Sequence, residues 1–237
     1  SINPWVSEIE WKGMYHADKV ITVSNYMKER IHKYYGVPRS KIEVVYNSVE
    51  HEKYEGERIK LGLDEKIVLF LGRLTLQKGP DYFLEAAKKV LQHMDGVKFI
   101  VAGKGDMLPQ LIHKSIELRI SEHVIFTGFV ESERDCYKMA DLYVMPSVSE
   151  PFGITALEAM ASGTPVIISR QSGVSEVVKH CMKVDFWNTD ELANKIIGVL
   201  SYTSLKREMK TNGLREIKNQ SWLNVAKETR RVYTSVM

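Results

Sequence analysis

The sequence predicts an α/β fold in which a doubly wound parallel sheet carries helices on both faces, in the Rossmann-like manner. Two observations support this prediction. From residue 67 onward, short continuous apolar runs alternate with helical patterns, and parallel strands that are buried on both faces have such sequences. Repeated strand–helix units with right-handed crossovers build a parallel sheet, which binds its ligands at the carboxyl ends of the strands.

A shorter pattern precedes the alternating part. Its apolar runs of β-forming residues predict strands, and its helices are marked by periodicity and by stop signals such as Gly36. The predicted order is helix 9–18, strand 20–23, helix 26–35 and strand 41–45. The charged residues 50–66 are expected to form a linker with one short helical turn.

The alternating part supplies the remaining elements. Strands are predicted at 67–71, 97–102, 124–127, 142–145 and 165–168. The helices between them are predicted at 81–94, 108–118, 132–139 and 154–162, with a helical turn at 174–178. Three helices, at 190–201, 204–218 and 221–237, complete the chain.

The helix at 154–162 has apolar residues around almost its whole circumference, so we expect it to be buried on every side. Pro151 is expected to open this helix, because its missing N–H is one that a first turn does not use. Gly163, followed by Pro165, is expected to end it. Glu158 is its one ionisable residue, and a buried carboxylate is costly unless something binds it.

Glu150 lies eight residues before Glu158. On one continuous helix the two would stand about 80° apart in azimuth and about 12 Å apart in height, too far for a close acid–base pair. We therefore place Glu150 in the loop and Glu158 inside the helix. The first free N–H groups of such a helix attract anions. These groups belong to Phe152, Gly153, Ile154 and Thr155.

Together these features predict two hydroxyl acceptors that flank a cluster of donors for a phosphate or a sugar. The alternative is that Glu150 is a solvated loop residue and Glu158 a paired structural charge.

The loop Leu71–Gly79 follows a predicted strand and precedes a helix. Arg73 offers a planar guanidinium fork and Lys78 a mobile point charge, a combination that suits a diphosphate. Both could instead be solvated cations on an ordinary loop. Residues 102–107 lack the third glycine of the dinucleotide fingerprint and are interpreted as a plain turn.

The totals exclude several classes of protein. The net charge of +3 is too small to indicate nucleic-acid binding, and no block of Lys and Arg supports it. Cys136 and Cys181 show neither metal spacing nor a disulfide framework, so we expect a cytoplasmic protein without a metal. No apolar run approaches the roughly 18 residues that a membrane span requires.

Several of these residues form one ordered set with strict spacing. The set comprises Arg73, Lys78-Gly79, Gly128-Phe-Val130, Ala140-Asp141, Glu150-Pro-Phe-Gly153 and the run from Glu158 to Val166. In this order they closely resemble the C-terminal half of retaining glycosyltransferases with the GT-B fold, sequence family 4. The resemblance covers about residues 15 to 237. Residues 172–177 and 183–187 look most like glycogen- or starch-synthase-like members.

The resemblance implies a nucleotide-sugar donor, a UDP-, ADP- or GDP-sugar, and a carbohydrate or other hydroxyl acceptor, with no cofactor and no metal. It implies that Arg73 and Lys78 act in catalysis by neutralising the donor diphosphate and stabilising the leaving nucleotide. By the same resemblance, Glu150 is a catalytic residue that contacts the donor sugar beside its anomeric carbon. Glu158 would hold the ribose hydroxyls.

The remaining donor contacts are also implied by the resemblance. Val130 would flank the base. The N–H groups of Phe152, Gly153, Ile154 and Thr155 would reach sugar hydroxyls and phosphate. Retention of configuration would proceed either through a front-face oxocarbenium-like transition state or through a covalent intermediate on Glu150.

The sequence departs from the resemblance at its beginning. Residues 1–48 match only a remnant of the N-terminal acceptor domain, 49–220 match the nucleotide-sugar-binding domain, and 221–237 match a terminal helix that packs on the N-terminal domain. We therefore expect the chain alone to bind nucleotide without turnover. Its uncovered apolar faces are expected to pair with the missing domain or with a second copy.

Two other functions remain open at this point. A sugar-nucleotide epimerase of the same architecture would carry different glutamate and histidine patterns. A non-catalytic nucleotide-binding module would need the loops but not the acid at Glu150.

Overall fold

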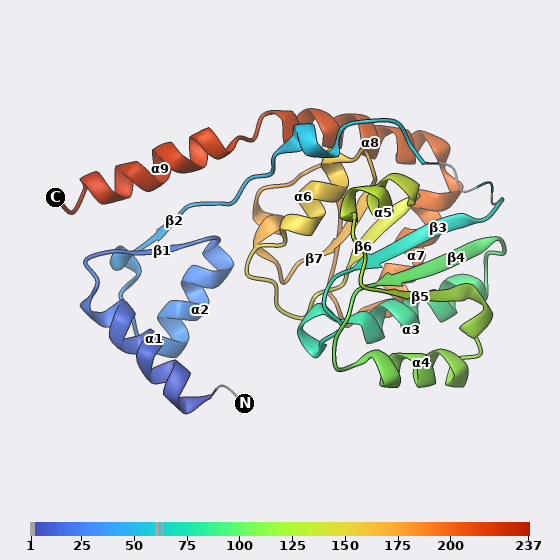
Figure 1. The fold of residues 1–237 in the computed structure, drawn as a ribbon, viewed down its shortest axis with the longest axis horizontal. Coiled ribbons are helices and arrows are strands. Elements are labelled where there is room, and N and C mark those ends of the chain that lie inside the picture. The colour runs from blue at the N-terminus through green and yellow to red at the C-terminus, as the bar shows by residue number, and fades with distance from the viewer. Residues whose placement is uncertain (1–2, 60–61, 63) are drawn as a thin grey trace.

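Six parallel strands form the central sheet of the computed structural model, which describes residues 3–59, 62 and 64–237 (Figure 1). The strand order is β5–β4–β3–β6–β7–β8, and every pairing is parallel. The strands are β3 (Lys66–Leu71), β4 (Val97–Ala102), β5 (Val124–Gly128), β6 (Leu142–Met145), β7 (Val166–Ser169) and β8 (Met182–Val184). The predicted doubly wound fold is therefore confirmed.

The direction of winding reverses between β3 and β6. From β3 the chain adds β4 and β5 on one side, and then returns to place β6, β7 and β8 on the other. In open α/β sheets the crevice outside the carboxyl ends of the strands at such a reversal is where ligands bind. The loops that follow β3 and β6 are the two that border this crevice.

Helices cover both faces of the sheet (Figure 1). One face carries α3 (Pro80–Leu91), α4 (Leu108–Glu117) and α7 (Thr189–Ser201), and the other carries α5 (Glu133–Met139) and α6 (Ile154–Ala161). The long helix α8 (Thr203–Lys218) contacts both α6 and α7. Each face has its own apolar core, built around Phe83 and Phe99 on the first and around Tyr137 and Leu157 on the second.

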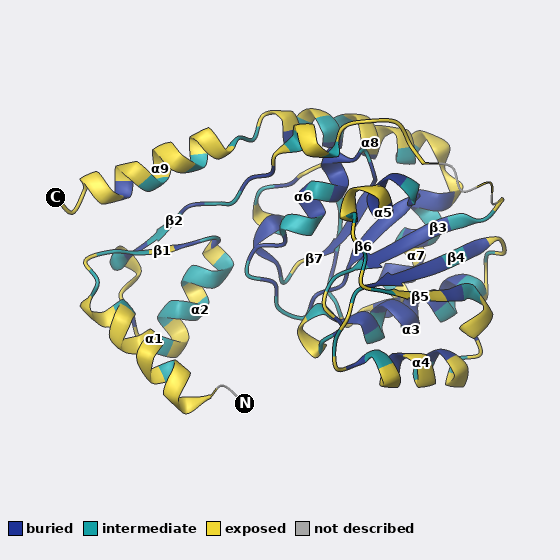
Figure 2. Cartoon of the chain, in the orientation of Figure 1, coloured by how far each residue is buried: buried dark blue, intermediate teal, exposed yellow. Residues whose placement is uncertain are grey.

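The N-terminal segment stands apart from this sheet. It consists of α1 (Pro4–His16), β1 (Val20–Thr22), α2 (Asn25–Tyr35) and β2 (Ile42–Val44), and its two strands pair in parallel with each other. The last helix, α9 (Trp222–Thr234), leaves the sheet and runs towards this segment (Figure 1). Figure 2 shows that α1 and α9 are mostly exposed, whereas β3, β4, β6 and β7 are mostly buried.

Five short 3-10 helices complete the described elements. They are η1 (Arg39–Lys41), η2 (His51–Tyr54), η3 (Leu76–Lys78), η4 (Ser121–His123) and η5 (Gly173–Glu176). The last of these replaces the helical turn predicted at 174–178. The first helix also begins earlier than the predicted residue 9, because Asn3 caps it and Pro4 occupies its first position.

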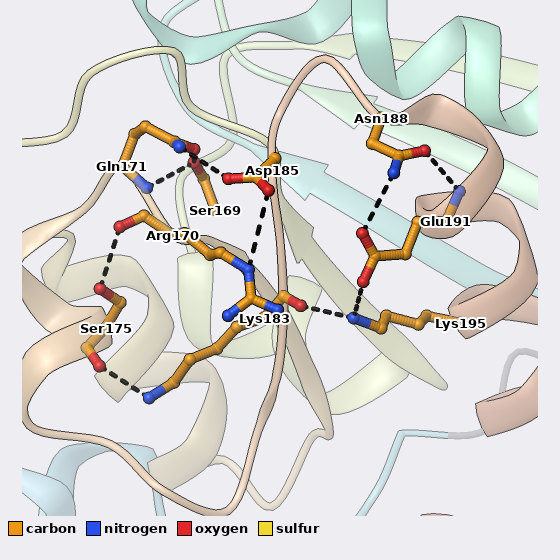
Figure 3. Close-up of polar contacts among 9 residues, drawn as sticks. All are labelled: Ser169, Arg170, Gln171, Ser175, Lys183, Asp185, Asn188, Glu191 and Lys195. Carbon is orange, nitrogen blue, oxygen red and sulfur yellow. Dashed lines mark hydrogen bonds and ion pairs between the residues drawn. The ribbon is translucent and has the colours of Figure 1, made fainter.

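Strand β8 was missed by the sequence prediction, since three residues are too short for a recognisable pattern. Polar contacts fix it at the edge of the sheet (Figure 3). Lys195 of α7 donates to the Lys183 carbonyl oxygen at 2.5 Å, and the Gln171 amide donates to Asp185 at 2.8 Å. The backbone N–H of Arg170 donates to the Val184 carbonyl oxygen at 2.9 Å. Contacts with other segments therefore determine that these residues form a strand, whereas their own sequence pattern does not.

Asp141, just before β6, ties three segments together. Its carboxylate accepts hydrogen bonds from Arg58 at 2.7 Å, from the Ile67 backbone N–H at 2.9 Å, and from Lys206 of α8. Burial alone would raise the pKa of Asp141, but the bonds from Lys206, Ile67 and Arg58 outweigh burial and lower it. This carboxylate joins the linker, the sheet and α8.

Asp141→Asn should lower the free energy of unfolding by about 3 kcal/mol, because it leaves Arg58 and Lys206 without their shared partner. The lowered pKa of Asp141 means that its contribution is present at neutral pH and is lost as the pH falls through that pKa. The deficit of the variant should therefore shrink in acid. Urea unfolding at several pH values measures this effect.

Asp190→Asn is the matched control, since Asp190 pairs with Lys89 at an exposed position of α7. Exposed pairs contribute about 0–1 kcal/mol, so this variant should differ little from the parent. Equal losses in the two variants would contradict the role given to Asp141.

Candidate active site

The loops after β3 and β6 contact one another at the reversal point of the sheet. Gly79 makes this approach possible, because a Cβ atom there would lie 2.2 Å from the Pro146 carbonyl oxygen and its φ is +66°. The backbone N–H of Val148 donates to the Gln77 carbonyl oxygen at 2.9 Å, and the Gln77 amide donates to Ser149 at 2.9 Å. The predicted diphosphate loop and the glutamate loop thus form one surface.

Lys78 and Glu150 form an ion pair at the centre of this contact. The Lys78 ammonium lies 2.5 Å from Oε2 of Glu150, and Ser147 donates to the same oxygen at 3.3 Å. The side chains are only 19% and 8% exposed, respectively. The resemblance assigns Lys78 to the diphosphate and Glu150 to the sugar of one donor; in the structure the two side chains also pair with each other.

The Glu150 loop is braced by the segment that follows β7. Backbone bonds join Glu150 to Gln171 and Gly173 at 3.0 and 3.1 Å, and the Val174 N–H donates to the Phe152 carbonyl oxygen at 2.7 Å. This extended pairing keeps the loop out of a helical conformation. The prediction that Pro151 opens α6 is therefore wrong.

Helix α6 begins at Ile154, the first residue of its predicted range, with Gly153 at its N-cap in the left-handed region at φ 104°. No side chain caps it. Within the described residues, the backbone N–H groups at its start have no hydrogen-bond partner. These groups belong to Phe152, Gly153, Ile154 and Thr155. Beside the Lys78–Glu150 pair, they leave a cluster of donors at the crevice.

Glu158 lies inside α6, as predicted, and its carboxylate is bound by a tyrosine. The Tyr137 hydroxyl donates to Oε2 at 3.0 Å. Burial is the main influence on its pKa and raises it above the ordinary value, while hydrogen bonding from Tyr54 and Tyr137 opposes this effect. The partner that a buried carboxylate requires is thus part of the protein.

Tyr143, in β6, is a buried tyrosine whose pKa is influenced by both glutamates. Its side chain is buried, and its hydroxyl donates to the Thr155 hydroxyl oxygen at 2.9 Å. Burial raises the pKa of Tyr143, and the carboxylates of Glu150 and Glu158 raise it further. Both acids therefore act on the same buried phenol. Sequence reasoning missed Tyr54, Tyr137 and Tyr143, because each meets its partner across a distant segment.

Arg73 and Val130 occupy different positions around this centre. The Arg73 side chain is exposed, and it forms no ion pair with the described residues. Val130 is partly buried against the core that includes α6. Its neighbour Phe129 is 67% exposed, and the Lys104 ammonium lies 5.5 Å from the centre of its ring.

The N-terminal segment docks directly on the glutamate loop. Ser24 donates to the Pro151 carbonyl oxygen at 2.7 Å, and the Glu176 carboxylate accepts the backbone N–H groups of Asn25 and Tyr26 at 2.9 and 2.7 Å. Glu176 thus caps the distant helix α2. A Cβ at Gly173 would lie 2.5 Å from the Ser24 Cβ.

Neither a metal-binding cluster nor a membrane-spanning helix is present in the part of the chain that the structure describes. No group of three or more His, Cys, Asp or Glu side chains there has an arrangement that could hold a metal ion. Among the same residues, no helix combines the length and apolar character that a bilayer crossing demands.

This combination of fold and loops is that of one half of a GT-B glycosyltransferase. The family model described as glycosyl transferases group 1 matches residues 54–216, and the model described as glycosyltransferase family 4 matches residues 1–53. The chain belongs to the group 1 glycosyltransferases.

Curated relatives include an uncharacterized glycosyltransferase of Methanocaldococcus jannaschii. It is 36% identical over 98% of this chain and 64% of its own length. The D-inositol 3-phosphate glycosyltransferase of Mycolicibacterium smegmatis is 35% identical over 68% of this chain and 40% of its own length. The chain thus spans about half the length of such relatives, at 40% and 64% for these two.

Solved structures share the fold at lower identity. Anabaena HepE in complex with UDP and glucose has a TM-score of 0.85 at 20% identity, covering 97% of this chain and 66% of that one. Sucrose-phosphate synthase from Thermosynechococcus elongatus has a TM-score of 0.81 at 24% identity, covering 99% and 62%.

Glu158→Gln should change how stability depends on pH. Because the pKa of Glu158 is raised, the folded chain holds this proton to higher pH than the unfolded chain does. Stability therefore falls as the pH rises from the ordinary glutamate pKa through the raised value. The variant lacks this fall, so its free energy of unfolding relative to the parent should improve as the pH rises from below the ordinary glutamate pKa of about 4.3.

Glu117→Gln, at an exposed position of α4, corrects for the change in net charge. Chemical unfolding across the pH series supplies the measurement. Parallel curves for the parent and Glu158→Gln would show that the buried carboxylate carries no such penalty.

Proposed function

We propose that this chain is the donor-binding part of a retaining glycosyltransferase that uses a nucleotide sugar. The observation that carries the proposal is the Lys78–Glu150 ion pair, which lies beside the uncapped start of α6 at the reversal point of the sheet. A cation, an acid and free N–H groups are the components needed to bind a diphosphate and a sugar side by side.

The donor diphosphate would lie between Arg73, Lys78 and the N–H groups of Phe152 to Thr155. Lys78 would then contact a phosphate oxygen as well as Glu150, so the pair opens towards the ligand. As the bond between sugar and phosphate breaks, negative charge develops on the diphosphate, and these fixed donors stabilise it. Glu150 would remain beside the anomeric carbon.

The nucleoside would extend from the diphosphate towards β5. Glu158 would accept the ribose hydroxyls while the tyrosines hold its carboxylate in place. Val130, at the end of β5, would flank the base. No cofactor or metal is part of this proposal, and the reaction takes place in the cytoplasm.

The acceptor side of the enzyme would be completed by a first domain. Residues 1–48 would belong to that domain, 49–220 would form the donor domain, and residues 221–237, which include α9, would pack back on the first domain. Exposed apolar side chains on α1 and α9, including Trp5, Trp11, Leu223 and Tyr233, are consistent with such a partner or with a second copy.

The acceptor is a hydroxyl of a carbohydrate or polyol in this proposal. None of the relatives named above is a glycogen or starch synthase, so that narrower expectation stays a prediction.

Lys78→Ala should weaken the binding of UDP to this chain roughly ten- to hundredfold, because a charge-assisted contact contributes about 1.5–3 kcal/mol. The affinity for uridine, which lacks the diphosphate, should not change. Lys114→Ala is the matched control, since Lys114 also pairs with a glutamate at 2.5 Å but lies on α4. Calorimetric titration with UDP, ADP and GDP measures the effect and identifies the base. Equal losses for UDP and uridine would place Lys78 away from the diphosphate.

Glu150→Gln separates a transferase from a simple nucleotide binder. In the transferase it should abolish glycosyl transfer by a protein that carries the whole first domain. The affinity of this chain for UDP should be kept or raised, because Lys78 no longer has a carboxylate partner. Full transfer activity in the variant would refute the catalytic role of Glu150.

A further inference from the structure

A basic pocket lies at the amino ends of the strands, on the opposite edge of the sheet from the donor loops. Its wall includes Ala140 before β6, Pro165 before β7 and the turn that ends α6, and its volume is about 340 Å³. Helix α6 therefore begins at the proposed donor site and ends at this pocket. Five basic side chains line it, namely Arg58, Lys138, Lys206, Lys210 and Lys218.

Three of these cations already have carboxylate partners. Arg58 and Lys206 share Asp141, and Lys218 lies 3.4 Å from Glu55 at an exposed position. In the described part of the chain, Lys138 and Lys210 contact no carboxylate within ion-pair distance. The pocket thus keeps an excess of positive charge.

Lys138 is the most informative of these residues, because it is only 7% exposed. Its ammonium donates to the Gly56 carbonyl oxygen at 2.6 Å. Burial lowers the pKa of Lys138 and repulsion from Arg134 and Lys210 lowers it further, while attraction from Glu55, beyond ion-pair distance, only partly opposes this shift. A buried ammonium without an anionic partner is costly, so an anion placed beside it would be strongly favoured.

A second unsatisfied group lies in the same wall. Ser162 is 6% exposed, and its hydroxyl has no hydrogen-bond partner among the described residues. The carbonyl oxygen of Ala161, at the end of α6, likewise accepts no hydrogen bond from them. The wall of the pocket therefore holds cations that suit an anion and, at the end of α6, two buried oxygens without a hydrogen-bond partner among the described residues.

We propose that this pocket binds a small phosphorylated sugar or polyol, with its phosphate between Lys138 and Lys210 and its hydroxyls facing the end of α6. The volume lies near the lower end of the roughly 300–1,000 Å³ of small-molecule sites, which suits a molecule of this size. This site is separate from the proposed donor site and does not depend on the function proposed there.

Calorimetric titration of the chain with glucose 6-phosphate tests the proposal, with inorganic phosphate and glucose as the two halves of the probe. A salt concentration of about 0.15 M screens contacts between exposed charges. The phosphate sugar should bind more tightly than either half. Lys138→Met with Lys210→Met should weaken its binding at least about tenfold, because two charge-assisted contacts are lost.

The control variant is Arg207→Ala with Arg215→Ala. It removes two exposed charges of α8, the helix that carries Lys210, at positions outside the pocket. It should change the affinity for the probe less than about twofold, since exposed charges contribute little. If the Lys138 variant fails to fold, Lys210→Ala with Lys218→Ala removes two exposed cations of the pocket and should give the same direction of change.

UDP distinguishes this site from the donor site. The pocket variants should leave the affinity for UDP unchanged, and Arg73→Ala with Lys78→Ala should leave the affinity for glucose 6-phosphate unchanged. The proposal is overturned if the probe does not bind at millimolar concentration. It is also overturned if the arginine control weakens binding equally, or if binding is lost with Arg73 and Lys78.

Discussion

The ion pair between Lys78 and Glu150 is the interaction on which the rest of the proposed site depends. It brings together two loops that leave the sheet from adjacent strands, β3 and β6, and both side chains are largely shielded from water. The approach is possible because Gly79 has no side chain where the Pro146 carbonyl oxygen passes. A polar contact of this kind favours one arrangement of the loops over others, and preorganised charge is what a reaction that displaces a diphosphate requires.

The same sheet carries two regions of different chemistry at its opposite edges. At the carboxyl ends of the strands, Lys78 is paired with Glu150 beside backbone N–H groups that lack a partner among the described residues. At the amino ends, Lys138 and Lys210 lack an acid among the described residues, although Asp141 holds Arg58 and Lys206 in place. Helix α6 has one end in each region. Its apolar residues fix its position between them, since Ala156, Leu157 and Ala159 are fully buried.

The sequence predicted the parts of the fold that have their own periodicity. The alternation after residue 67 predicted the bounds of β3 to β7 to within one residue. Short continuous apolar runs of this kind are typical of strands buried on both faces of a parallel sheet. It did not give β8, which has three residues and is held by Lys195 and by Arg170. It did give the start of α6 at residue 154, but not through Pro151, because the pairing of Glu150 with the distant residues Gln171 and Gly173 keeps Pro151 outside the helix.

The sequence predicted which residues belong to the candidate site, but not which residues they contact. Arg73, Lys78, Glu150 and Glu158 stand out by residue type and spacing. Which atoms they contact is decided by segments far away in the chain. The hydroxyl that binds Glu158 comes from α5, 21 residues earlier, and the acid that pairs with Lys78 lies 72 residues later. A local sequence pattern cannot predict contacts between residues that are so far apart along the chain.

The capping of α2 by Glu176 has a practical consequence for anyone who dissects this protein. A fragment cut at residue 49 would keep every strand of the large sheet, yet it would lose Ser24, Asn25 and Tyr26. The Pro151 carbonyl oxygen, on the loop that carries Glu150, and the Glu176 carboxylate, on the segment that braces this loop, would then turn to solvent. Truncating the chain to its α/β domain would therefore loosen the loop that carries Glu150. The shorter fragment would be less suitable for ligand-binding measurements than the whole chain.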